Sequence, residues 1–96
     1  GYSVFVPLGD GNKVDLIFID NCIAKRVQVK SPLKYDNTYV IDLRHSCGVK
    51  RSRTQKYSEN DIDFFATVLN GELYLIPIKE VAGKSTFSLK DNRFII

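Results

Sequence analysis

Three polar residues in the first third of the chain have the types that phosphodiester hydrolysis requires. Asp15 is a carboxylate within a mostly apolar stretch, and Gln28 and Lys30 stand at the end of the next such stretch. A carboxylate binds a hard divalent cation and an amide oxygen adds a neutral ligand, while an ammonium group orients or activates the attacking water and offsets phosphate charge. Brought together, these side chains would form a site for metal-assisted hydrolysis.

A β-hairpin is predicted to bring the three side chains together. Residues 13–20 and 22–30 are rich in apolar residues and have the pattern of two strands. A two-residue loop at positions 20–21 then places Asp15 opposite Arg26, whereas a three-residue loop would move Asp15 to the other face. The polar residues that share one face in the two-residue register are Asp15, Arg26, Gln28 and Lys30.

The same residues allow a purely structural interpretation. Asp15 could pair with Arg26 across the hairpin and take no part in catalysis. Gln28 and Lys30 could belong to the solvent face of an ordinary amphipathic hairpin, since antiparallel sheets commonly expose one polar face.

A second feature is a basic window between positions 44 and 56, which holds five Lys or Arg residues and no acid. The chain's net charge is +3, so the rest of the chain is net negative. The interleaved Ser, Thr, Gln and Gly residues predict a polar loop or ribbon that contacts DNA phosphates, with Arg51 and Arg53 as candidates for guanine readout. A solvated loop without a partner is the alternative. The predicted DNA-binding residues are Arg44, His45, Lys50, Arg51, Arg53 and Lys56.

The remaining elements predict an α+β fold with a mixed sheet and one or two short helices. Ser58 precedes two acids and an apolar face, which favours a short helix over 58–65, with Asp63 bracing a basic neighbour or supporting the site from behind. Asn70-Gly71 is a strong hairpin signal. Further strands are expected at 2–7, 38–43, 66–69, 72–76 and 85–89, with loops at 9–12 and 34–37.

Length and composition set outer limits on the function. Ninety-six residues make a single domain, 1–96, which excludes a two-domain enzyme, and neither a membrane span nor a signal peptide is indicated. Cys22 and Cys47 fit no metal spacing and are interpreted as free thiols in a reducing cytosol. The chain has no Met, so we expect it to be a piece of a longer protein.

These residues carry a resemblance to a known family. Asp15 followed by Gln28-Val29-Lys30 resembles the core motif of the PD-(D/E)xK nuclease superfamily, with Gln in place of the second acid. The chain is most similar to the bacterial group I intron-encoded homing endonucleases of that superfamily. The segments that carry this similarity are GYSVFVPLGD, VDLIFID, RVQVKS, YSENDIDFFA and ELYLIPI.

The resemblance implies a restriction-endonuclease-like core and a DNA endonuclease that depends on Mg²⁺ (or Mn²⁺) and acts on duplex DNA in a prokaryotic cytoplasm. It assigns metal binding to Asp15 and Gln28 and a catalytic role to Lys30. It also implies a helix before the first strand that adds another acid, and this chain would begin after that helix. Val14 stands where the family has proline. A nuclease that cuts both strands usually needs two symmetric sites, so a homodimer or homotetramer is expected.

Three other functions stay open from the sequence. A junction-resolving nuclease of the same superfamily would have a similar core. A non-catalytic duplex-binding module would keep the ribbon without a complete metal site, and a protein interaction domain would show neither activity.

Overall fold

The computed structural model describes residues 3–6, 14–47 and 53–96, with the backbone alone for residues 3, 45–47 and 53–55. Within these residues the chain is built almost entirely of strands, which confirms the sheet-rich core. The strands are β1 (Ser3–Phe5), β2 (Leu16–Asp20), β3 (Ile23–Val29), β4 (Leu33–Tyr35), β5 (Thr38–Asp42), β6 (Arg44–Cys47), β7 (Arg53–Lys56), β8 (Phe64–Leu69), β9 (Glu72–Pro77) and β10 (Thr86–Ser88), and η1 (Ile78–Glu80) is a single 3₁₀ turn.

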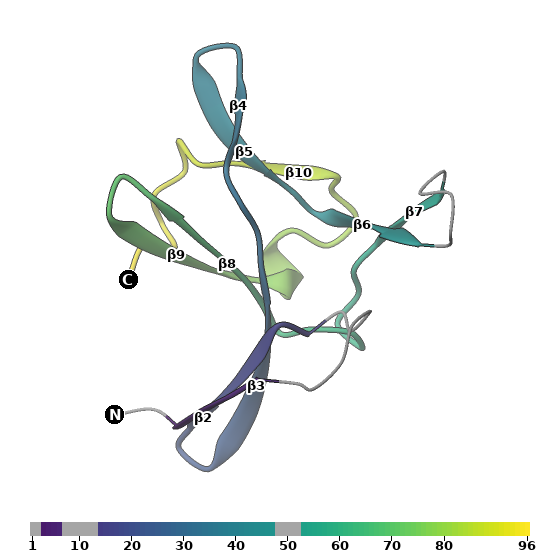
Figure 1. Cartoon of the computed structure of the whole chain (residues 1–96), viewed down its shortest axis with the longest axis vertical. Helices are drawn as coiled ribbons and strands as arrows, with labels where there is room; N and C mark the ends of the chain where they lie inside the picture. The colour runs from purple at the N-terminus through teal and green to yellow at the C-terminus, as the bar shows by residue number, and fades with distance from the viewer. Residues whose placement is uncertain (1–2, 7–13, 48–52) are drawn as a thin grey trace.

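The strands form two sheets and a separate ribbon. The larger sheet has the order β1-β2-β3-β8-β9 and is mixed, because β3 and β8 run parallel while its other pairs are antiparallel. A smaller antiparallel sheet has the order β10-β5-β4, and β6 pairs with β7 alone. Figure 1 shows the β2–β3 and β4–β5 hairpins at opposite ends of the molecule and the β6–β7 ribbon extending to one side.

The first hairpin forms as predicted, but its turn lies one residue later than expected. Asp20 pairs with Ile23, so the loop is Asn21-Cys22, and both loop residues have positive φ, 51° and 65°. Positive φ at both central residues is the geometry of a type I′ turn, which matches the twist of the flanking strands. The placement of Asp15 opposite Arg26 is therefore wrong, because Ile17 takes that position.

The expected sharing of one face survives this correction. The loop still has two residues, so alternation along both strands is unchanged. Continued by one position, the observed register brings Asp15 level with Gln28 rather than with Arg26.

The predicted helix over 58–65 is wrong. Asp61 accepts a hydrogen bond from the Ser58 amide (2.9 Å), and Ser58 accepts one from the Asn60 amide (3.3 Å), so the capping chemistry closes one turn. The Asp63 amide then donates to the Arg26 carbonyl (2.9 Å), and β8 begins beside β3. The segment thus pairs in parallel with a distant strand instead of continuing as a helix. Its β-branched and aromatic residues favour this outcome, because such residues have a high preference for strands.

The other hairpins divide between confirmed and corrected predictions. Asn70 and Gly71 form the predicted turn between β8 and β9, with φ of 52° and 79°. The segment 34–37, predicted as a loop, instead contributes to β4, which pairs with β5 around a turn containing Asp36. The predicted strands near both ends of the chain are present as β1 and β10, while residues 9–12 lie outside the described part.

The core lies where the two sheets meet residues 57–62, the segment that follows β7. Its fully buried members come from β5, the residue between β5 and β6, the turn before β8, β8 and β9, and include Ile41, Leu43, Ile62, Phe65 and Ile76. Tyr57, the first residue after β7, packs its ring edge-on against Phe65 with the centroids 5.2 Å apart. The described part of the chain holds no helix long and apolar enough to cross a membrane.

Candidate active site

Lys30 directly follows β3, and its side chain contacts two residues at the base of the β6–β7 ribbon. Its amide donates to the Ala66 carbonyl (2.8 Å), which continues the parallel pairing of β3 with β8. Its ammonium donates to the Arg44 carbonyl (2.9 Å) and lies 5.1 Å from the centroid of the Tyr57 ring. Burial lowers the pKa of Lys30, an effect that the negative charges of Asp42 and Asp15 oppose.

Asp15 is exposed and stands directly before β2, next to the end of β3. Its Oδ2 accepts a hydrogen bond from the Val29 amide (2.8 Å), and its own amide donates to the Val27 carbonyl (2.8 Å). Asp15 therefore contacts both peptides that flank Gln28, the one after Gln28 through its carboxylate and the one before it through its main-chain amide. Together with its electrostatic effect on Lys30, this contact brings all three predicted catalytic residues to one end of β3.

Gln28 supplies an oxygen that lacks a partner. Its Oε1 is buried with no hydrogen-bond donor, while its Nε2 makes a long contact of 3.4 Å with the Val29 carbonyl. Buried side-chain acceptors are usually satisfied, so an orphaned amide oxygen beside a carboxylate is a feature that a hard cation would complete. Asp15 and Gln28 thus fit a divalent cation in donor chemistry.

The protein side of such a metal site is small. Within the described ranges no three or more His, Cys, Asp or Glu side chains gather where they could hold a metal ion. A cation on Asp15 and Gln28 would take its other ligands from water and from substrate phosphate, as Mg²⁺ commonly does.

Arg26 does not pair with Asp15, so the structural alternative for Asp15 is wrong in this form. Arg26 instead contacts Asp63, through Nε to Oδ2 (3.2 Å) and Nη2 to Oδ1 (3.2 Å), and its amide donates to Asp63 Oδ2 (2.8 Å). The guanidinium also donates to the carbonyls of Glu59 and Asn60. Hydrogen bonding to Asp63 raises the pKa of Arg26, and Asp63 thus braces a basic neighbour.

Asp42 belongs to the surroundings of Lys30 and was missed by sequence reasoning. It is the last residue of β5, and its charge acts on both Lys30 and Tyr57. Hydrogen bonding to Arg44 lowers the pKa of Asp42 and keeps it a carboxylate. An acid at the end of an apolar strand and two positions before an arginine was the available signal. Burial, with the charges of Asp15, Asp61 and Asp42, raises the pKa of Tyr57 to about 12.

The basic window is a ribbon, and two of its charges are engaged by the protein itself. Arg44 and Lys56 face each other at its base, where Arg44 pairs with Asp42 (3.1 Å) and Lys56 donates to the Gly83 carbonyl (2.8 Å). His45 and Arg53 lie on paired strands, with only their backbone described. Lys50 and Arg51 lie outside the described residues, so the predicted guanine readout has no structural test.

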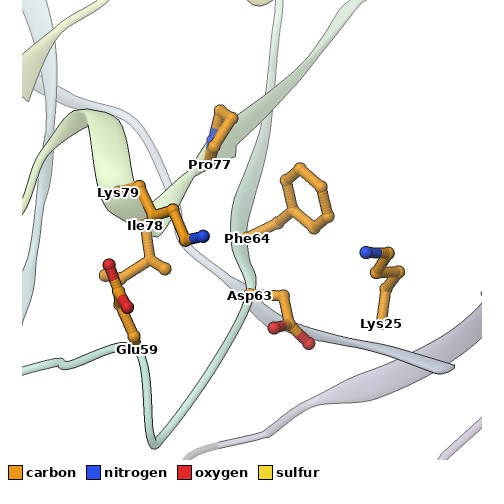
Figure 2. Close-up of a pocket in the computed structure, with 7 residues that line it drawn as sticks. All are labelled: Lys25, Glu59, Asp63, Phe64, Pro77, Ile78 and Lys79. Atoms are coloured by element: carbon orange, nitrogen blue, oxygen red, sulfur yellow. The ribbon is translucent and has the colours of Figure 1, made fainter. Parts of the chain in front are cut away.

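A pocket of about 340 Å³ lies on the other face of the large sheet. Figure 2 shows Lys25 and the Phe64 ring on one side of it and Glu59 and Lys79 on the other. In the sheet register Phe64 is level with Val27, whereas Gln28 is level with Phe65 on the opposite face. This pocket therefore contains none of the predicted catalytic residues.

A carboxylate, an amide oxygen and a lysine converge at the end of one strand of a mixed sheet, an arrangement that suits metal-assisted phosphodiester hydrolysis. Comparison with known proteins agrees, because the model of the PD-(D/E)XK endonuclease family matches residues 1–93. The chain belongs to this family.

A solved structure is similar over nearly the whole chain. It is that of a bacterial homing endonuclease, I-Ssp6803I, with a TM-score of 0.77 and 31% sequence identity, over 96% of this chain and 68% of that one. Among curated proteins, none matches this chain. The family and the structural neighbour support nuclease activity, and a DNA partner follows from membership in an endonuclease family.

Proposed function

We propose that this chain is a metal-dependent endonuclease that hydrolyses phosphodiester bonds in double-stranded DNA, in the manner of a homing endonuclease. The observation that carries the proposal is the meeting of Asp15, Gln28 and Lys30 at the end of β3, with the Gln28 oxygen buried and unpartnered. The similar structure is that of a bacterial homing endonuclease, which supports the same class.

The residues divide the chemistry between them. Asp15 and Gln28 would hold Mg²⁺ or Mn²⁺, and the ion when bound supplies Lewis-acid stabilisation of charge on the phosphate oxygens. Lys30 brings an ammonium to this end of β3. It orients the attacking water and offsets the charge that develops at phosphorus.

The ribbon supplies the contact with duplex DNA. Its basic residues neutralise phosphates and place the scissile bond next to β3, and two copies of the chain, as a homodimer or homotetramer, present two sites to the two strands. The proposal includes a DNA-associated location in a prokaryotic cytoplasm, in keeping with the bacterial origin of the similar structure. Because Arg44 and Lys56 are anchored at the base, most of the phosphate contact is assigned to His45, Lys50, Arg51 and Arg53.

The test is cleavage of supercoiled plasmid with and without Mg²⁺. The unchanged chain should nick or linearise the plasmid only with the ion, and Asp15→Ala and Lys30→Ala should each lower cleavage by about 10²-fold or more. Lys90→Ala changes an exposed lysine in the tail and serves as the matched control. Undiminished cleavage by both Asp15→Ala and Lys30→Ala contradicts the proposal, and a parallel assay on four-way junctions identifies a junction-resolving nuclease instead.

A non-catalytic duplex-binding module is the second candidate. The observation in its favour is that the described residues gather no group of three or more His, Cys, Asp or Glu side chains that could hold a metal ion. This candidate predicts duplex binding that weakens steeply with salt and no cleavage at any concentration of Mg²⁺ or Mn²⁺. Cleavage that requires Asp15 rules it out.

A further inference from the structure

The catalytic lysine is attached to both strands of the DNA-binding ribbon at once. The Lys30 ammonium donates to the carbonyl of Arg44, the first residue of β6, and lies over the ring of Tyr57, the residue that follows β7. Since β6 and β7 pair only with each other, these two residues are the root of the ribbon. The ribbon therefore meets the candidate site through Lys30.

The Arg44 peptide that holds Lys30 is itself held by Asp42. Asp42 Oδ1 accepts hydrogen bonds from the Arg44 amide (2.9 Å) and from Arg44 Nε (3.1 Å), and Nη2 lies 3.3 Å from Oδ2. The Asp42 carboxylate thus holds Arg44, whose carbonyl accepts the hydrogen bond from the Lys30 ammonium (2.9 Å). The chain of contacts runs from the Asp42 carboxylate through the Arg44 main chain to the Lys30 ammonium.

Tyr57 fixes the lysine from the other side. Its buried ring packs edge-on against Phe65 and presents a face 5.1 Å from the ammonium. A cation over an aromatic face is attracted to it, and the attraction strengthens as water is removed. The ammonium is therefore located by a carbonyl and a ring, both from the root of the ribbon.

We propose that Asp42 and Tyr57 are positioning residues for Lys30, so that the root of the ribbon sets the catalytic lysine in place for phosphodiester hydrolysis. The inference rests on the proposed function for the role of Lys30, and on the contacts of Lys30 with Arg44 and Tyr57 for its placement. Neither residue needs to touch substrate or metal. Displacement of a catalytic group by about 1 Å can cost two orders of magnitude in rate, so loosening this clamp lowers the rate of the chemical step.

The test uses the half-exposed Asp42, whose replacement leaves the core intact. Single-turnover cleavage at saturating duplex DNA and Mg²⁺ is compared with the Kd for the same duplex. We expect Asp42→Ala to lower the rate about tenfold while the Kd stays unchanged or falls, because the Arg44 guanidinium is released for phosphate. Asp42→Asn should recover most of the lost rate, since its amide oxygen still accepts from the Arg44 amide.

The matched control is Asp91→Ala, which breaks an Asp-x-Arg contact of the same local geometry in the tail, remote in sequence from the site. It should cleave like the unchanged chain. A normal rate in Asp42→Ala overturns the proposal, and so does an equal loss of rate and DNA affinity, or an Asn variant no better than Ala.

Tyr57 is tested by its ring rather than its hydroxyl. Tyr57→Phe keeps the aromatic face and should retain most of the rate, whereas Tyr57→Leu should lose about tenfold without weaker DNA binding. Equal rates in folded Phe and Leu variants contradict the role of the ring.

The position of the Lys30 side chain is measured by NMR, a readout that does not depend on DNA cleavage. The Lys30 methylene protons should resonate upfield of those of an exposed lysine in the unchanged chain and in Tyr57→Phe, and less so in Asp42→Ala. Unshifted Lys30 protons in the unchanged chain overturn the placement. If the unchanged chain does not cleave DNA, the proposed function fails, and this measurement alone decides the positioning.

Discussion

The same three-residue arrangement occurs at two places in the molecule and serves different ends. In Asp42-Leu43-Arg44 and in Asp91-Asn92-Arg93 the carboxylate accepts from the amide and the guanidinium of the arginine two residues on. The two carboxylate side chains are about equally exposed, 37% and 30%. In each case the hydrogen bond from the arginine lowers the pKa of the aspartate.

The difference lies in what the main chain beyond the pair contacts. The Arg44 carbonyl accepts from Lys30, so the first pair supports the candidate site. Arg93 lies over the Phe94 ring (5.0 Å), and the Phe94 carbonyl accepts from the Leu75 amide (2.9 Å), so the second pair holds the tail against β9. A local motif therefore acquires its role from its long-range contacts.

The largest expected effect comes from removing the group that the first pair supports. Lys30→Ala should lower the single-turnover rate by about 10²- to 10³-fold, as loss of a positioned catalytic group typically does. In the Lys30→Ala background, Asp42→Ala should cause no further loss of rate. Replacing the aspartate of either Asp-x-Arg pair should then have the same small effect on the rate. Independent losses that multiply in the double variant contradict the shared role, and Lys30→Ala with Asp91→Ala is the control.

The next largest effect concerns a third pair, Arg26 in β3 with Asp63 directly before β8, two residues 37 positions apart. Asp63→Ala removes hydrogen bonds from both the amide and the guanidinium of Arg26 and should cost about 1 to 2 kcal/mol. Urea unfolding at neutral pH measures this loss. If Asp63→Ala is as stable as Asp91→Ala, a long-range pair has no advantage over a local one.

The stability that Asp63 adds should depend on pH. Burial alone would raise the pKa of Asp63, but the hydrogen bonds from Arg26 outweigh burial and leave it lowered. A carboxylate with a lowered folded pKa stabilises the protein above its unfolded pKa of about 3.9, and this contribution is lost as the pH falls through the folded value. Urea midpoints of the unchanged chain and Asp63→Ala should differ near neutrality and converge below about pH 4. A constant difference down to acid pH contradicts this role.

The smallest effect is expected at the tail. Asp91 and Arg93 form an exposed pair, and such pairs contribute little to global stability. Asp91→Ala should leave the urea midpoint unchanged within error and speed hydrogen exchange at the Leu75 and Ile96 amides, which bond the tail to β9. A clear fall in the urea midpoint of Asp91→Ala would contradict this prediction. It would show that the tail pair contributes to global stability, so that the two local pairs differ in stability as well as in role.

The sequence predicted the shared face of the three candidate residues better than the elements around them. Asp15, Gln28 and Lys30 share a face because strand alternation survives a turn moved by one residue, from 20–21 to 21–22. Cys22 adopts φ of 65°, which residue preferences disfavour, so the observed turn was hard to choose.

Features that depend on distant partners were beyond local reasoning. The capping chemistry of Ser58 is real, but whether a helix follows is decided by pairing with β3. The contact of Arg26 with Asp63 has no local signal for the same reason. β4 is short and wholly exposed, so it lacks the alternation that identifies a strand.

The parallel pairing of β3 with β8 also constrains when the site can form during synthesis. The hairpin that carries Asp15 and Gln28 is local and can close as soon as it leaves the ribosome. The Lys30 amide finds its acceptor only at Ala66, and its ammonium lies over Tyr57. Non-local pairings of this kind close late, so a nascent chain that stops before β8 exposes the hairpin without a fixed lysine.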